Sequence, residues 1–386
     1  METETRHSQT TESQRLPDDL LCNILSRLPV LNLMQYRCVS KSWQSMISDP
    51  QFIKTHLHQS TQSLDTQRLM VTHPFNGYFI SLDYESCHES KWVVSPWKSS
   101  YSYAEVLCSC DGLFLLRLHY KPFRSPNKTS NKEFVLWNPS IRKYVKFSCP
   151  YNAINYISSE LYGLCFDSST NGYIVIILSR RFGICVWVFD LKTLSWKDIS
   201  DSSFSISDRE NGVLVNGALH WIVTSKKCDS PVIVYFDLMV EKFKEVPKPD
   251  YGSKFVKFGL VDLSGWLCLY GWTDQTQVDI WAMKEYGKKE SWTKLIVIPA
   301  KIGSNICFLK PLCLTKTGEV LVEINNSELA IYNPKECTFR TSICLKGVHS
   351  TMYVESLVLL YDGIDTTKVR HKKVNPNRVY RNRLKK

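Results

Sequence analysis

Histidines, cysteines and carboxylates are the side chains of this sequence that could carry catalysis or bind a metal ion. The nine histidines include one close pair, His56 and His58, and one histidine inside an apolar run, His220. A pair two residues apart just after a helix favours a polar contact at the helix end over a metal site. A histidine inside a strand favours a buried core residue over a general base. The carboxylates are dispersed, so they do not identify a catalytic acid pair.

Motifs of catalysis and nucleotide binding are absent from the sequence. It contains no G-x-S-x-G nucleophile elbow and neither glycine-rich phosphate loop, G-x-G-x-x-G or G-x-x-x-x-G-K-[ST]. The fourteen cysteines are scattered singly, and Cys108 and Cys110 are the only close pair. In an intracellular protein this pattern favours free, buried thiols over zinc or disulfides. We therefore expect no cofactor, no metal and no enzymatic activity.

The composition is ordinary for a globular protein of two or three domains, with 386 residues of which 44% are hydrophobic and 22% charged. The first fourteen residues are polar and lack the apolar segment of a secretory signal. The longest apolar run, residues 173–178, is far shorter than the roughly 20 residues that span a bilayer. We therefore expect an intracellular protein without membrane contact.

The net charge of +11 is concentrated at the C-terminus. Residues 368–386 contain nine Lys or Arg and no acidic residue, which leaves about +2 for the rest of the chain. Such a tail suits a disordered, solvated end, a nuclear import signal or a nonspecific nucleic-acid contact, in that order of preference. We expect a disordered basic tail over residues 366–386, a location in nucleus and cytoplasm, and no nucleic-acid partner.

Apolar residues near the start of the chain recur at helical spacing: Leu20, Leu21, Ile24, Leu25 and Leu28. This pattern predicts a helix that begins at about Pro17 and ends before Pro29. A second apolar run, residues 31–36, leads to a third helix capped by Ser40 and ending before Pro50. Three helices in about forty residues cannot bury all these leucines among themselves, so the module needs a partner surface.

Residues 14–58 resemble the F-box. The resemblance rests, in order, on Leu16-Pro17, Ile24-Leu25, Arg27-Leu28-Pro29, Arg37-Cys38-Val39-Ser40-Lys41-Ser42-Trp43 and Pro50-Gln51-Phe52. In that family the helices pack on a Skp-type adaptor, which links them to a cullin-RING ubiquitin ligase. The resemblance implies that nine residues contact the adaptor or hold its binding surface in shape: Leu16, Pro17, Leu20, Ile24, Leu25, Leu28, Pro29, Val39 and Trp43. Aspartate at position 28 would then weaken adaptor binding by burying an unpaired charge.

Two signals recur along the rest of the chain. The first is a polar residue followed by glycine, which suits a tight hairpin turn: Asn76-Gly77, Asp111-Gly112, Asn171-Gly172, Asn216-Gly217, Ser264-Gly265 and Thr317-Gly318. These steps lie about 48 residues apart on average, a kelch-like period. The second is a strand that ends in Asn or Asp, with an aromatic residue six positions later: Asn138 and Tyr144, Asp190 and Trp196, Asp237 and Phe243, Asn333 and Phe339. Trp292 takes the same place after a longer turn.

Each repeat therefore predicts a four-stranded antiparallel sheet that is apolar on both faces and must be covered on both sides. Stacking such sheets around an axis covers them and leaves few free edges. We predict a mainly β protein with a small α module, in which a three-helix F-box precedes a kelch-like β-propeller of about six four-stranded blades. The propeller spans residues 65–365 and is closed by the apolar run at 352–360, while residues 1–13 are predicted to be disordered.

The body also resembles the F-box-associated domain of a large plant family. The matching segments are Cys110-Asp111-Gly112-Leu113, Trp137-Asn138-Pro139-Ser140, Tyr162-Gly163-Leu164-Cys165-Phe166-Asp167, Val213-Leu214-Val215-Asn216-Gly217-Ala218-Leu219-His220-Trp221 and Tyr353-Val354-Glu355-Ser356-Leu357. Cys165 departs from the usual pattern in a motif whose role is structural. Six tryptophans at repeat positions are expected to pack between blades: Trp137, Trp187, Trp196, Trp221, Trp281 and Trp292. Phe123, in a polar loop, is a better candidate for recognition.

Together these resemblances imply a substrate receptor of an SCF-type ubiquitin ligase. Its partners would be a Skp-type adaptor, a cullin reached through that adaptor, and a target protein that the sequence does not identify. Two other functions are consistent with the same features. One is a scaffold or inhibitor that holds the adaptor without delivering a target, and the other is a propeller enzyme whose front helices are incidental.

Overall fold

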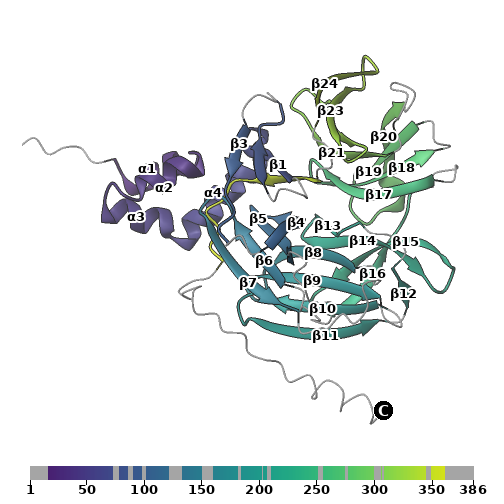
Figure 1. Ribbon diagram of the computed structural model, residues 1–386, viewed down its shortest axis with the longest axis horizontal. Helices are drawn as coiled ribbons and strands as arrows, with labels where there is room; N and C mark the ends of the chain where they lie inside the picture. The colour runs from purple at the N-terminus through teal and green to yellow at the C-terminus, as the bar shows by residue number, and fades with distance from the viewer. Residues whose placement is uncertain are drawn as a thin grey trace, which may run out of the picture.

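The computed structural model describes residues 16–72, 78–85, 90–97, 101–120, 133–149, 160–180, 184–201, 203–206, 210–250, 255–273, 277–299, 306, 308–344 and 349–360. Within these residues, four α-helices precede six sheets arranged in a ring (Figure 1). The helices are α1 (Asp18–Leu25), α2 (Val30–Tyr36), α3 (Lys41–Ser48) and α4 (Pro50–Gln62), and two 3-10 turns are η1 (Leu64–Thr66) and η2 (Lys289–Ser291).

The six sheets are the blades of a propeller, each built from strands that are antiparallel neighbours. Blade 1 contains β25 (His349–Val354), β1 (Gln67–Thr72), β2 (Phe79–Leu82) and β3 (Ser90–Val93). Blade 2 contains β4 (Tyr101–Cys110), β5 (Leu113–Tyr120), β6 (Glu133–Asn138) and β7 (Lys143–Ser148), and blade 3 contains β8 (Glu160–Asp167), β9 (Gly172–Arg180), β10 (Ile184–Asp190) and β11 (Ser195–Asp201).

Blade 4 contains β12 (Phe204–Ser205), β13 (Val213–Val215), β14 (Ala218–Ser225), β15 (Ser230–Asp237) and β16 (Lys242–Val246). Blade 5 contains β17 (Phe255–Leu263), β18 (Trp266–Thr273), β19 (Gln277–Met283) and β20 (Trp292–Pro299). Blade 6 contains β21 (Leu309–Leu314), β22 (Val320–Ile324), β23 (Glu328–Asn333) and β24 (Thr338–Cys344). The predicted propeller of six blades is therefore confirmed.

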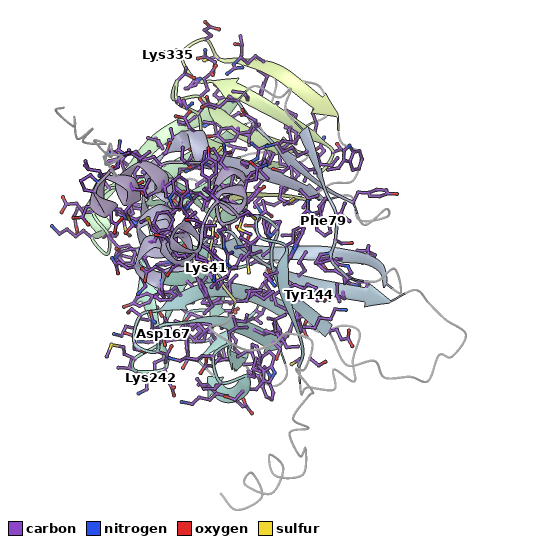
Figure 2. All side chains as sticks on the ribbon, turned by 90° about the vertical axis from the view of Figure 1, so that its left-hand side faces the viewer. Lys41, Phe79, Tyr144, Asp167, Lys242 and Lys335 are labelled. Atoms are coloured by element: carbon purple, nitrogen blue, oxygen red, sulfur yellow. The ribbon has the colours of Figure 1, made fainter. Side chains whose placement is uncertain are left out.

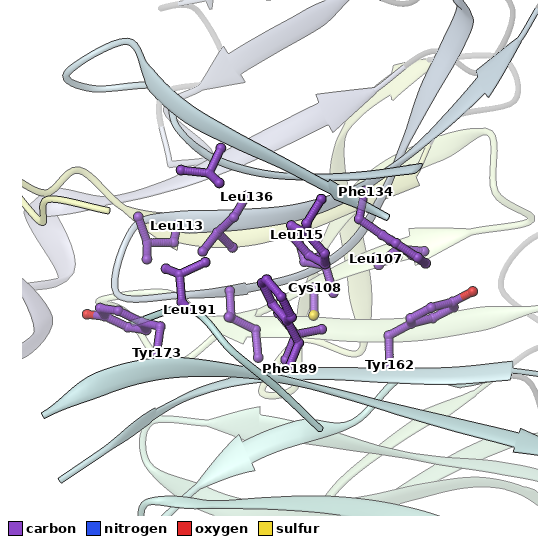
Figure 3. Close-up of a cluster of buried hydrophobic side chains, with 14 of the residues drawn as sticks. Leu107, Cys108, Leu113, Leu115, Phe134, Leu136, Tyr162, Tyr173, Phe189 and Leu191 are labelled. Carbon is purple, nitrogen blue, oxygen red and sulfur yellow. The ribbon is translucent and has the colours of Figure 1, made fainter. Parts of the chain in front are cut away.

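The ring is closed by β25, the last strand, which pairs antiparallel with β1 over its full length. The innermost strands of the six blades contact one another in a complete circle: β25, β4, β8, β13, β17 and β21. An apolar cluster fills each of the six junctions between neighbouring blades. The largest lies between blades 2 and 3, where Leu113, Leu115 and Phe134 face Tyr162 and Phe189 (Figure 3). The hydrophobic core of the body is thus a set of wedges between sheets.

The glycine steps mark the turns between the first and second strands of blades 2 to 6. Asp111 and Gly112 have φ of 52° and 79°, and both positions of the steps at 216–217 and 264–265 are also positive. Two consecutive positive φ values are the geometry of a type I′ hairpin turn, which glycine accepts without strain. Gly77 lies outside the described residues, between the second and third strands of blade 1, so this step is not equivalent to the others.

The Asn and Asp residues of the second signal end the third strand of four blades. Each side chain accepts a hydrogen bond from the backbone N–H two residues ahead, at 2.8 to 3.0 Å, as an Asx turn requires: Asn138 from Ser140, Asp190 from Lys192, Asp237 from Met239 and Asn333 from Lys335. The aromatic residue six positions later then lies opposite the residue that precedes the Asn or Asp. This is the predicted turn chemistry.

Two details of the prediction are corrected. The helical module has four helices where three were predicted, because Asp49 caps a new helix at Pro50 by accepting bonds from Gln51 N and Phe52 N. His56 and His58 therefore lie inside α4 and not after a helix. Blade 4 has five strands, because two short strands, β12 and β13, pair with the two ends of β14 where one first strand was predicted.

Candidate functional site

The helical module carries an unusual number of apolar side chains on its surface. Exposed fractions are 57% for Leu16, 54% for Leu20, 51% for Ile24, 60% for Leu31 and 64% for Val39. Leu20 and Ile24 are four residues apart, so they share one face of α1. Exposed apolar residues in such number on so small a unit are typical of a surface that binds a partner. We call these five residues the apolar face.

The nine residues predicted for adaptor binding divide into two groups. Six are exposed: Leu16, Pro17, Leu20, Ile24, Pro29 and Val39. Three belong to the interior of the module: Leu25 is buried, while Leu28 and Trp43 pack against the same cluster. Trp43 also meets Tyr36 edge to face, with ring centroids 5.6 Å apart. Aspartate at position 28 would therefore disturb the packing of the module as well as any contact with a partner.

Leu31 is the member of the apolar face that was not among the predicted site residues. Its apolar run predicted a helix, but the spacing did not show which side of that helix would lack a partner. The four helices are short, and Val30 and Leu33 are the residues of α2 that are fully buried. The exposure of Leu31 therefore results from the way that the helices pack, and a single sequence does not specify that packing.

The propeller has a helix-side face, which carries the glycine turns and the Asx turns. Figure 2 looks onto it with the helices in front: Lys41 of α3 lies near the centre, and Asp167, Lys242 and Lys335 from three blades lie above and below it. Ile53 and Leu57 of α4 pack against the cluster between blades 2 and 3. Lys54 donates a hydrogen bond to Asn171 in the glycine turn of blade 3, at 3.3 Å. α4 is thus the element that attaches the module to the propeller.

The C-terminal segment, residues 355–360, lies in the joint between the helices and the blades. Leu357 is buried in the core of the helical module together with Leu25, Leu33 and Phe52, and Ile141 from an Asx turn joins them. Val358 and Leu360 enter the cluster between blades 2 and 3 instead. One short segment therefore contributes to both cores, so the module and the propeller are packed as a single body.

Asn138 fixes this segment. Its Oδ1 forms the Asx turn, while its Nδ2 donates to Ser356 O at 3.1 Å and to Val358 O at 3.0 Å. The side chain of Asn138 is completely buried. Ser356 Oγ in turn donates to Asp111 O at 2.6 Å. Three segments that match the F-box-associated pattern, around residues 111, 138 and 356, thus meet at one place.

Gly112 is required where these segments meet. A Cβ at this position would lie 2.5 Å from Ser356 Oγ and 2.6 Å from Val354 O, and its φ is +79°. The close approach excludes a side chain, and the left-handed backbone disfavours one. The glycine step of blade 2 thus has a second role, which is to admit the C-terminal segment. Its four counterparts lack this role. A Cβ at 217, 265 or 318 would meet nothing within 4 Å, and a Cβ at 172 would meet only atoms at ordinary contact distance.

His56 ties α4 to the turn between α1 and α2. Its Nε2 donates to Leu28 O at 3.0 Å, and the side chain is almost completely buried. Burial lowers the pKa of His56, although the bond to Leu28 and the nearby charge of Glu355 act in the opposite direction. The histidine is therefore neutral at pH 7, and its Nε2 makes a structural contact.

Comparisons with known protein families agree with this architecture. A family described as "F-box domain" matches residues 13–55, and one described as "F-box associated beta propeller domain" matches residues 68–367. The chain belongs to the F-box proteins with an F-box-associated β-propeller domain. The helical module is the F-box, and the second match covers all six blades.

Relatives from Arabidopsis thaliana span nearly the same length. The F-box protein CPR1 is 29% identical, with 93% of this chain and 92% of the relative aligned. The F-box/kelch-repeat protein At3g23880 is 28% identical over 82% of this chain and 87% of the relative. Among solved structures, AofleA from Arthrobotrys oligospora aligns with a TM-score of 0.39 and 9% identity over 78% of this chain and 92% of that chain. A similarity at that level does not indicate the function of this F-box protein.

A polar network bridges blades 2 and 3 on the half of the propeller away from the F-box. Arg117 contacts Glu105 at 2.6 Å and Tyr162 OH at 3.1 Å, His119 contacts Glu105 at 3.0 Å, and Tyr162 OH donates to Glu160. Burial opposes ionisation of Glu105, but the hydrogen bonds and charges of His119 and Arg117 outweigh it and hold its pKa at about 2. The network is an internally paired bridge between blades, so Glu105 stays ionised and does not suit a general acid.

His220 has the core position that was predicted for it. It is fully buried in β14, and its Nε2 contacts Tyr286 OH at 2.7 Å, which joins blade 4 to blade 5. The six tryptophans at repeat positions likewise lie in clusters between blades. Every cysteine whose side chain is described is a free thiol. Phe123 lies outside the described residues.

The burial of His220 makes stability depend on pH. Burial lowers its pKa from 6.5 to about 4, so the unfolded chain takes up a proton first as pH falls. Its contribution is complete above pH 6.5 and decreases between pH 6.5 and about 4. We expect the free energy of unfolding of the parent to fall about 2 kcal/mol more between pH 7 and pH 5 than that of a His220→Gln variant. Urea titrations followed by tryptophan fluorescence measure this, and equal pH dependence would contradict it.

No group of three or more His, Cys, Asp or Glu suited to a metal occurs within the described residues. In the same part of the chain, no helix has the length and apolar character needed to cross a membrane. The features that stand out are therefore the apolar face of the F-box, the joint around the C-terminal segment and the surface of the propeller.

Proposed function

We propose that this protein is the substrate receptor of an SCF-type ubiquitin ligase. The F-box binds a Skp-type adaptor, the adaptor links the protein to a cullin, and the propeller recruits a target protein for ubiquitination and degradation. The chain itself is not an enzyme. We also propose that it works in nucleus and cytoplasm.

The apolar face of the F-box is the observation that carries this proposal. Leu20 and Ile24 are half exposed although they belong to a helix whose opposite side is packed in the joint with the propeller. An adaptor that covers this face would remove the apolar surface from water. The propeller would remain free to bind a second protein at the same time.

The firm attachment of the F-box to the propeller supports a role in positioning a target protein. Since Leu357 and Asn138 link the F-box to the blades, a target held by the propeller would keep a fixed distance from the adaptor. Tethering a target beside the ubiquitin-conjugating enzyme raises its effective concentration there, and this is the whole contribution a receptor needs to make.

Target half-lives test the proposal. The parent and a Leu20→Asp/Ile24→Asp variant are expressed in plant cells, co-purified proteins are identified, and their decay is followed by mass spectrometry after translation is blocked. We expect at least one co-purified protein to decay faster with the parent than with the variant, which keeps the propeller but lacks the adaptor-binding face. Recovery of adaptor and cullin without any such protein would indicate a scaffold or inhibitor instead.

A further inference from the structure

An exposed aromatic patch lies at the outer side of blade 1, where Trp92 belongs to β3, Tyr78 precedes β2 and Val94 follows β3. Exposed fractions are 57% for Tyr78, 66% for Trp92 and 83% for Val94. Tyr78 and Trp92 meet edge to face with ring centroids 5.5 Å apart, so the pair is ordered without a partner. The pairing of Ile80 with Trp92 puts all three side chains on the same face of the sheet. We call Tyr78, Trp92 and Val94 the blade 1 patch.

Within the described residues, no strand lies beside the outer edge of β3, the strand that holds Trp92. β3 pairs with β2 on one side and is the end of its sheet. The outer strands of the other five blades also end their sheets, but their exposed residues include Lys143, Lys197, Lys242, Lys294 and Arg340. Within the described part of the chain, β3 is the outer strand with an exposed aromatic side chain. β3 carries an exposed lysine as well, Lys91, so the exposed aromatic side chain is what distinguishes it from the other outer strands. An exposed apolar side chain at a strand edge favours pairing with another chain.

We propose that this edge binds an extended segment of the target protein, in which apolar residues alternate with acidic ones. The proposal rests on the receptor function proposed above and assigns its target site. The segment would add a strand beside β3 through backbone hydrogen bonds. Its apolar side chains would lie against Trp92 and Val94, and its acidic side chains, on the opposite face of the sheet, would lie near the exposed Lys91.

The size and charge of the patch favour a peptide of another protein over a second copy of this chain and over the chain's own basic tail. The three side chains expose roughly 400 Å² at most, which suits one short peptide, whereas each partner of a stable dimer buries about 800 Å². The basic residues at 368–386 carry the same charge as Lys91 and contain no acidic residue, so the chain's own tail is disfavoured. A segment from another protein that supplies carboxylates fits both constraints.

A displayed peptide library tests this site. Random twelve-residue peptides are selected on the purified full-length protein, and the enriched peptides are measured against the parent, Trp92→Ser and Met239→Ser. Met239 is the matched control, because it is 88% exposed on the Asx turn of blade 4. We expect enriched peptides with alternating apolar and acidic residues, and a loss of affinity of about thirtyfold or more in Trp92→Ser but not in Met239→Ser.

Three results would overturn the proposal. The first is that the enriched peptides bind Trp92→Ser as tightly as they bind the parent. The second comes from hydrogen exchange: the bound peptides protect backbone amides outside residues 90–95 and not within them. The parent could also prove to be a dimer that Trp92→Ser converts to a monomer, which would make a second copy of the chain the occupant. None of these results depends on the adaptor, so recovery of adaptor and cullin with Trp92→Ser separately tests the receptor function.

Discussion

Aspartate at both Leu20 and Ile24 is expected to weaken binding to a Skp-type adaptor by at least about a hundredfold. Each side chain is an apolar anchor whose loss from a buried interface costs about 2 kcal/mol or more, and each aspartate would bury an unpaired charge. Titration of the purified protein with purified adaptor measures the effect. Because both residues are about half exposed in the free protein, the free energy of unfolding should change by less than about 1 kcal/mol.

A matched control exists in the same chain. Met239 and Val240 are 88% and 52% exposed on the Asx turn of blade 4, and Val240 matches the 51% of Ile24. Met239→Asp/Val240→Asp adds the same charge to a comparably exposed apolar pair outside the F-box. It should bind adaptor like the parent. Equal losses in the two double variants would mean that charge, and not the apolar face, accounts for the result.

Asn138→Asp is expected to destabilise the protein by about 3 kcal/mol or more, because it changes one buried donor into an acceptor. The new carboxylate could still form the Asx turn through the position of Oδ1. Its other oxygen, however, would face Ser356 O and Val358 O, which accept from Nδ2 at present. The midpoint of urea unfolding, followed by tryptophan fluorescence, measures the loss.

Asn333→Asp is the control for this substitution. Asn333 occupies the same turn position in blade 6, and blades 3 and 4 carry aspartate there naturally, at Asp190 and Asp237. Asn333→Asp should therefore leave the free energy of unfolding within about 0.5 kcal/mol of the parent. If Asn138→Asp were equally harmless, the C-terminal segment would not depend on the Asn138 amide, and the account of the joint would be wrong.

Local turn chemistry explains how much of the fold could be predicted from the sequence. Asp111-Gly112 and its counterparts need positive φ, and Asn138 and its counterparts bond to the backbone two residues ahead. Both properties lie within a few residues of the chain, so their recurrence predicted blades 2 to 6, whereas the sixth step counted, Asn76-Gly77, is not the equivalent turn of blade 1. Closure by the end of the chain was predicted correctly, but the predicted run at 352–360 overlaps the closing strand β25 only at 352–354, because Leu357, Val358 and Leu360 pack in the joint.

Long-range contacts explain what could not be predicted. The bonds from Asn138 to Ser356 and Val358 join residues more than 200 positions apart, and no local pattern indicates them. The fourth helix was missed because Asp49 and Pro50 suit the end of one helix and the start of the next equally well. The blade 1 patch was missed because Trp92 resembles the tryptophans that pack between blades, and only the packing distinguishes them.

Affinity purification of the full-length protein from plant cells tests the central claim most directly. The Skp-type adaptor and cullin are quantified by mass spectrometry for the parent, Leu20→Asp/Ile24→Asp and Met239→Asp/Val240→Asp. A receptor of an SCF-type ligase predicts that the parent and the second variant recover both proteins and that the first variant loses both. Absence of adaptor and cullin from a folded parent, or their undiminished recovery with Leu20→Asp/Ile24→Asp, would contradict the function proposed for the apolar face.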